Sequence, residues 1–168
     1  SSGASTTVQV AGNNTYTGTT TISAGTLKLG SATALGTGAV SVTSGAALDL
    51  NGQTMTSTGG LTLNGTGISS GGALMNSSAT PATYAGLITL GSASSIVAGA
   101  GAINVINIGT ITGSGFGLTL GGTTGGTLSS VIGTGLGTLT KEGTGTWTLT
   151  AANTYDGLTT VSTGILAI

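Results

Sequence analysis

The sequence has no cysteine, no histidine, a single proline and very few charges. The formally charged side chains among its 168 residues are Lys28, Asp49, Lys141, Glu142 and Asp156. Without cysteine there is no disulfide framework, and without histidine no Ser-His-Asp triad can form. Two lysines and no arginine cannot neutralise a row of phosphates, so the composition excludes a nucleic-acid partner.

Long hydrophobic runs are also missing, which excludes a membrane-spanning segment of the helical kind. Such a helix needs about 20 apolar residues in succession, whereas residues 103–108 (INVINI) are interrupted by asparagine and followed by glycine. The 34 glycines suggest disorder, but apolar residues recur at spaced positions throughout the chain. The start, Ser1-Ser2-Gly3, has no signal-peptide character, so we expect either that a signal was removed or that the chain is part of a longer protein.

What the sequence does contain is a repeated alternation of apolar and polar residues, each run followed by a turn. Such runs occur at residues 8–10, 27–29, 40–42, 48–50, 61–63, 118–120, 147–149 and 165–168. Period two places the apolar side chains on one face of a strand. Positive φ angles are expected at the intervening turns, at Gly30, Gly36, Gly45, Asn51-Gly52, Asn64-Gly65 and Gly121-Gly122. The chain is therefore predicted to be all-β.

The spacing of the strands favours a solenoid, although a hairpin meander or a sandwich stays open because Asn-Gly is a hairpin signal. Val40, Leu48 and Leu61 mark strands whose spacing gives a cycle of about 21 residues, in the range of stacked repeats. A sandwich exterior would carry more charge. We predict that these strands pair in parallel with coils about 20 residues away. One core is expected to contain Val40, Val42, Leu48, Leu50, Leu61 and Leu63.

The two ends of the chain carry similar segments. Residues 8–29 (VQVAGNNTYTGTTTISAGTLKL) and 147–168 (WTLTAANTYDGLTTVSTGILAI) share nine identities in 22 positions at an offset of 139 residues. The same supersecondary unit is thus expected at both ends of a single domain spanning residues 1–168.

The second of these segments resembles the autotransporter-associated β-strand repeat. The resemblance is carried by residues 143–150 (GTGTWTLT), by 153–157 (NTYDG), by 159–161 (TTV) and by Gly164; residues 8–29 look like a second copy. It implies a right-handed parallel β-helix. With the cycle of about 21 residues, the chain is expected to form about eight coils of roughly 20 residues. The resemblance also implies the passenger region of a secreted or surface-tethered Gram-negative protein, where such segments serve as stalks, adhesins or scaffolds.

No constellation for catalysis, cofactor binding or metal binding is apparent. A glycosidase needs two carboxylates about 5–10 Å apart, and only three acidic residues exist, in different elements. Alternation places Asp49 on the solvent side of its strand, and Lys141-Glu142 is expected to be an exposed pair at a turn. Three scattered acids cannot form a Ca²⁺ cage.

The repeated tyrosines, the single tryptophan and the threonine runs each have a structural interpretation that we favour over a binding function. Tyr16 and Tyr155 recur in the Asn-Thr-Tyr-x-Gly segment, which favours a structural turn over sugar stacking. Trp147 takes the place of Val8 and is expected to pack inward. Threonine runs such as residues 19–21 invite comparison with ice-binding solenoids, but the second copy has Leu158 where the first has Thr19, which breaks a regular lattice.

The functional expectation is an extracellular, non-enzymatic scaffold or stalk segment at the bacterial cell surface, with no cofactor. The alternative is an adhesin module binding a glycan or host surface; an ice-binding solenoid or a polysaccharide-active enzyme is less favoured. The expected partner is the chain itself, stacked end to end or continued in a longer β-helix, because residues 164–168 end in an apolar strand.

Overall fold

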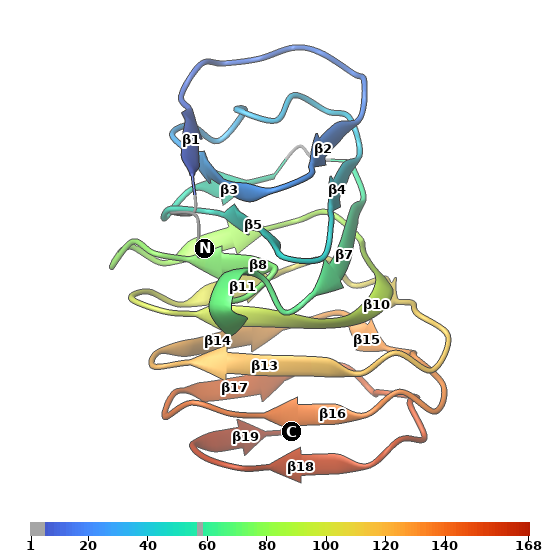
Figure 1. Ribbon diagram of the computed structural model, residues 1–168. Helices are drawn as coiled ribbons and strands as arrows, with labels where there is room; N and C mark the ends of the chain where they lie inside the picture. The colour runs from blue at the N-terminus through green and yellow to red at the C-terminus, as the bar shows by residue number, and fades with distance from the viewer. Residues whose placement is uncertain (1–5, 57–58) are drawn as a thin grey trace.

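The computed structural model describes residues 6–56 and 59–168, and the start Ser1-Ser2-Gly3 lies outside them. The chain is a parallel β-solenoid of about eight turns with about 21 residues per turn (Figure 1). All pairings between described strands are parallel. The all-β solenoid prediction is confirmed, and neither Asn-Gly pair forms a hairpin.

Each coil runs along three faces. Face 1 contains β2 (Thr20–Ile22), β4 (Val40–Val42), β7 (Leu61–Gly65), the first part of β10 (Ile88–Ala98), β12 (Thr110–Ile111) and β15 (Val131–Ile132). Face 2 contains β1 (Thr7–Val10), β3 (Gly25–Leu29), β5 (Ala46–Asp49), β8 (Leu74–Asn76), the last part of β10, β13 (Leu118–Gly122), β16 (Leu139–Lys141) and β18 (Thr159–Val161). Face 3 contains β6 (Thr54–Met55), β9 (Ala82–Tyr84), β11 (Ile103–Val105), β14 (Gly125–Leu128), β17 (Thr146–Leu149) and β19 (Ile165–Ala167).

Alternation along each strand builds one continuous core. Val40 pairs with Leu61, which pairs with Ile88 in the next coil, so apolar side chains of equivalent positions stack inside the solenoid. The six residues predicted to share a core are all buried and all belong to the same hydrophobic cluster: Val40, Val42, Leu48, Leu50, Leu61 and Leu63. That prediction is confirmed, as is the spacing of about 21 residues between Val40 and Leu61.

Turn glycines behave mostly as predicted. Positive φ angles occur at Gly36, Gly45, Asn51, Gly52, Gly65 and Gly122. The prediction is wrong for Gly30, Asn64 and Gly121, which have no positive φ among the described backbone angles. Gly30 instead continues the ladder of β3, donating its N–H to the carbonyl of Val10 at 2.8 Å.

Two irregularities were not predicted. A short 3-10 turn (Ile68–Ser70) lies between β7 and β8, and it lengthens that coil. The strand β10 continues from face 1 to face 2 without a turn, and its register shifts between Leu90 and Ser94. Within residues 6–56 and 59–168, no helix has the length and apolar character needed to cross a membrane.

The two similar segments have the same strands at opposite ends of the solenoid (Figure 1). β1 pairs with β3 through Thr7 and Thr26, and β17 pairs with β19 through Thr146 and Ile165. These pairings are offset by 139 residues, like the sequence identities.

Candidate functional site

The outer surface of the solenoid carries ladders of short polar side chains. On face 1, the outward residues of successive coils are Thr21, Ser41, Thr62, Thr89 and Thr112. On face 3 they are Thr54, Thr83, Asn104, Thr127 and Thr148. Members of each ladder are separated by about 4.8 Å, the spacing of neighbouring strands, and none is charged.

The row of residues on one side of the face 1 ladder does not repeat its hydroxyl groups. This row lies two residues before the ladder in each coil. Ala39 and Gly60 belong to it, because Val40 pairs with Leu61. Leu87 also belongs to it, since its carbonyl accepts a hydrogen bond from the Leu61 N–H. A second file of hydroxyl groups is therefore interrupted on face 1. The interrupted row agrees with the expectation that threonine does not form a two-dimensional lattice here.

Asp49 is buried, so the prediction that it is solvent-exposed is wrong. It does lie on the outer side of its strand, but residues of the next coil cover it. One carboxylate oxygen accepts from the backbone N–H groups of Asn51 (2.9 Å) and Ser77 (3.0 Å). The other accepts from the Ser77 hydroxyl at 2.5 Å and lies 4.0 Å from Lys28 Nζ. Asp49 therefore ties two coils together at a turn.

Lys141 is also buried, so the predicted exposed Lys141-Glu142 pair is wrong for the lysine. Lys141 stacks on Leu120 at a core-facing position. Its Nζ donates to the backbone carbonyls of Glu142 (2.7 Å), Gly143 (2.7 Å) and Thr163 (3.2 Å). This lysine clasp joins the turn that precedes β17 to the turn that precedes β19.

Burial lowers the pKa of Lys141 below its ordinary value of 10.5, and the nearby carboxylate of Glu142 raises it to a smaller extent. The unfolded chain therefore binds more protons than the folded chain between the lowered pKa and 10.5. The free energy of unfolding is expected to rise as the pH increases through that window, and to reach its full value above 10.5.

Urea denaturation between neutral and alkaline pH measures this rise. Lys141→Met, which keeps most of the side-chain volume, is expected to lack it, whereas Lys28→Met on the partly exposed β3 position is expected to keep it. Equal pH dependence in the two variants would contradict a titrating lysine clasp.

Asp49 and Glu142 do not form a catalytic pair. On face 2, Asp49 is followed in successive coils by Met75, Val97 and Gly121, and Glu142 lies next to Gly121. Asp49 and Glu142 are thus four coils apart, or about 19 Å at the strand spacing. That exceeds the separation across which two carboxylates act on one glycosidic bond. Among the described residues, no three His, Cys, Asp or Glu side chains gather at one place.

The repeated tyrosines make the same contact in both copies. Tyr16 Oη lies 2.7 Å from Thr20 Oγ1, and Tyr155 Oη lies 2.7 Å from Thr159 Oγ1. This contact closes the turn before β2 and before β18, which supports the structural interpretation. Trp147 is buried as predicted, and its indole N–H donates to the Gly121 carbonyl at 3.0 Å.

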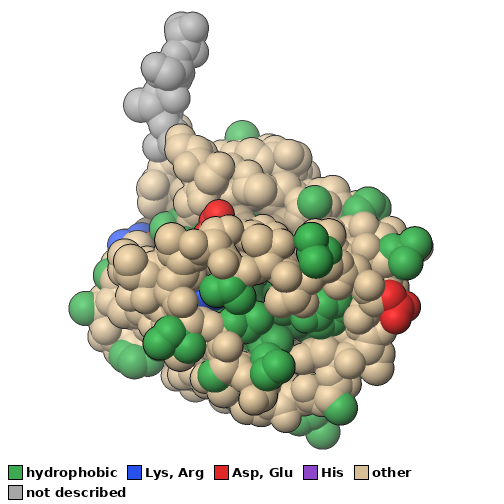
Figure 2. Space-filling model, turned by 90° about the horizontal axis from the view of Figure 1, so that it is seen from below, with side chains coloured by type: hydrophobic (Ala, Val, Ile, Leu, Met, Phe, Trp, Pro, Cys, Tyr) green, Lys and Arg blue, Asp and Glu red, His purple; other side chains and the backbone are tan. Residues whose placement is uncertain are grey.

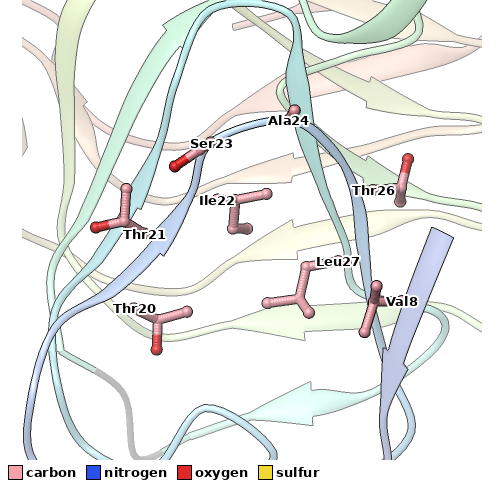
Figure 3. Close-up of a pocket in the computed structure, with 8 residues that line it drawn as sticks. All are labelled: Val8, Thr20, Thr21, Ile22, Ser23, Ala24, Thr26 and Leu27. Carbon is pink, nitrogen blue, oxygen red and sulfur yellow. The ribbon is translucent and has the colours of Figure 1, made fainter. Parts of the chain in front are cut away.

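Both ends of the solenoid are hollowed. At the N-terminal end, a hollow of about 240 Å³ lies between β1, β2 and β3, with Val8, Ile22 and Leu27 pointing into it and threonines at its rim (Figure 3). At the C-terminal end, apolar side chains are visible in the centre of the face (Figure 2). A second hollow of about 420 Å³ at that end is lined by Asn153, Tyr155 and Ile168, among others.

Comparison with protein families identifies the two end segments. The passenger-associated-transport-repeat family matches residues 2–29 and 139–168, which include both similar segments. With the solenoid, this confirms the predicted resemblance to an autotransporter passenger repeat. No match to the chain was found among curated proteins or among solved structures.

Proposed function

We propose that this chain, an autotransporter passenger segment by its repeats and its solenoid, is an extracellular scaffold or stalk at the bacterial cell surface. The proposal rests on the hydrogen bonds of the polar side chains, which hold the solenoid itself together. The ionic groups Asp49 and Lys141 and the repeated tyrosines all bond to neighbouring coils or turns. What faces solvent on faces 1 and 3 is mainly uncharged hydroxyl ladders, which suit a rod that keeps other parts of a protein apart.

A test is to display the segment on cells and to replace the face 1 ladder with valine at Thr62, Thr89 and Thr112. Valine keeps the β-branched shape of threonine and removes the hydroxyl group. If the segment is a scaffold, the valine variant is expected to display a terminal tag as well as the unchanged segment does, with the same cell adhesion. Adhesion that falls at least about tenfold, a loss of about 1.4 kcal/mol, would contradict the scaffold function.

An adhesin that binds a glycan is the second candidate, because the hollow at the C-terminal end combines an aromatic ring with polar groups. Tyr155 and Asn153 line it, and aromatic rings offer an apolar face to a ligand. A glycan array with Tyr155→Ala and the matched control Tyr16→Ala separates the candidates. Binding lost only in Tyr155→Ala would favour the adhesin, and no specific binding by any of the three proteins favours the scaffold.

We propose no catalytic role. The four-coil separation of Asp49 and Glu142 argues against a glycosidase, and the clasp that holds Lys141 argues against its use as a base. Depolymerisation of uronate polymers by the purified chain would contradict this part of the proposal.

A further inference from the structure

Both Asn-Gly pairs of the chain lie in the interior of the coil stack, with a coil before them and a coil after them. Asn51-Gly52 follows β5 on face 2, and Asn64-Gly65 ends β7 on face 1. The two glycines have positive φ angles of 73° and 77°, a conformation that residues with a side chain rarely adopt. The turn geometry therefore favours glycine after asparagine at both positions.

An asparagine that precedes glycine is chemically labile in a flexible chain. The glycine nitrogen gives up its proton to solvent base and attacks Cγ of the asparagine, and the Cγ–Nδ2 bond breaks to release ammonia, which regains that proton. Water then opens the cyclic imide at either carbonyl and leaves aspartate or isoaspartate. Glycine favours the attack because it has no Cβ atom to hinder ring closure. An unfolded chain is therefore open to deamidation at Asn51 and Asn64.

The folded solenoid holds the leaving group of each pair. Asn51 Nδ2 donates to the carbonyl of Leu29 at 2.7 Å, and Asn64 Nδ2 donates to the carbonyl of Val42 at 2.9 Å. Both acceptors lie 22 residues earlier, in the preceding coil. These are the distances of well-formed hydrogen bonds, so neither amide can turn toward the backbone without breaking a bond between coils.

The attacking nitrogen is held from the other side. Gly52 N–H donates to Asn76 Oδ1, and Gly65 N–H donates to Ser92 Oγ, each at 2.9 Å. Both acceptors belong to the following coil. A hydrogen bond of this kind stabilises the protonated nitrogen and opposes the loss of its proton. Each pair thus has its leaving group tied to one neighbouring coil and its nucleophile tied to the other.

We propose that Asn51 and Asn64 are deamidation sites whose reactivity is set by folding: the coil stack shields both, and a chain that stays unfolded loses them. Loss before folding weakens the fold, because a carboxylate has no proton to donate to the carbonyl of Leu29 or Val42. Isoaspartate also adds one carbon to the backbone, which disturbs the register of pairing with the next coil. The reaction therefore removes chains that remain unfolded for long. This inference does not depend on the scaffold function.

Peptide mapping by mass spectrometry measures deamidation at each site of the 168-residue chain, folded in buffer and unfolded in urea at the same mildly alkaline pH. Both asparagines are expected to react at least about tenfold more slowly in the folded chain, since the reaction needs a local opening of the stack. Equal rates in the folded and unfolded chains would overturn the proposal.

Ser92→Ala tests the hold on the nucleophile, because it removes the acceptor of the Gly65 N–H. In the folded variant, Asn64 is expected to react about fivefold faster, the factor that corresponds to one ordinary hydrogen bond. Asn51 is the control within the same sample, and its rate is expected to stay unchanged. An unchanged rate at Asn64, or an equal rise at both sites, would show that the bond to Ser92 gives no protection of its own.

The effect of the product on the fold is measured with Asn51→Asp and Asn64→Asp. Each is expected to unfold at a lower urea concentration than the unchanged chain, as followed by circular dichroism. Asn13→Asp is the matched control, because Asn13 Oδ1 accepts from the Thr33 hydroxyl at 2.9 Å and a carboxylate can do the same. Equal stability of the three variants would contradict the proposal that deamidation weakens the fold.

Discussion

Replacement of Trp147 by alanine is expected to lower the free energy of unfolding by about 3–5 kcal/mol, the usual range for a buried tryptophan. The ring is fully buried, in a ladder with Gly126 above it and Leu166 below it. The substitution removes this packing and the indole hydrogen bond to Gly121. A cavity this large cannot be refilled by strands held in register on both sides.

Val8→Ala is the matched control because Val8 occupies the same repeat position in the N-terminal copy. Val8 is 55% exposed, so its truncation is expected to cost about 0.5 kcal/mol or less. Urea denaturation followed by circular dichroism measures both; fluorescence is unsuitable because Trp147 is the only tryptophan. Similar losses in the two variants would show that the copies are not packed as described.

The second large effect is expected from Gly126→Ala in the middle of the stack. A Cβ atom at this position would lie 1.8 Å from the carbonyl oxygen of Ile103, its partner in β11. Since the clashing atom belongs to the backbone, the strands β11 and β14 must move apart. We expect a loss of about 3 kcal/mol, at the upper end of the usual cost of overpacking.

Gly18→Ala is the control for this substitution. No heavy atom lies within 4 Å of a Cβ atom at Gly18, and its φ is outside the left-handed region. Alanine there restricts the unfolded chain, so stability is expected to stay unchanged or to rise by up to about 1 kcal/mol. Equal stability of Gly126→Ala and Gly18→Ala would show that β11 and β14 do not approach each other as closely as described.

The sequence predicts the strands and the core well because both depend on local alternation. Val40 and Leu61 alternate with polar residues, and the 21-residue cycle brings them together. The prediction that Asp49 is solvent-exposed is wrong because alternation gives the side of the strand on which a residue lies, but not what covers that side. Ser77, 28 residues away, closes over the carboxylate, and no spacing in the sequence indicates this contact.

Lys141 was missed for a different reason. The run Leu139-Thr140-Lys141 has period two and places the lysine on the core side, but a charge there contradicts the usual preference for solvent. The three carbonyls that accept from its Nζ resolve the conflict, and one of them comes from the following coil. A lysine in phase with core leucines and followed by a glycine turn is the signal that could have indicated the clasp.

The proposed scaffold function requires the chain to be a spacer whose length is the sum of its coils. Since Ile168 corresponds to Leu29, a second copy of residues 30–168 appended after Ile168 continues the repeat in phase. Small-angle X-ray scattering of this longer chain measures that length directly. We predict one rod of unchanged cross-section that is longer by about 30 Å, the rise of six to seven coils. Two bodies lying side by side, or a rod of unchanged length, would contradict it.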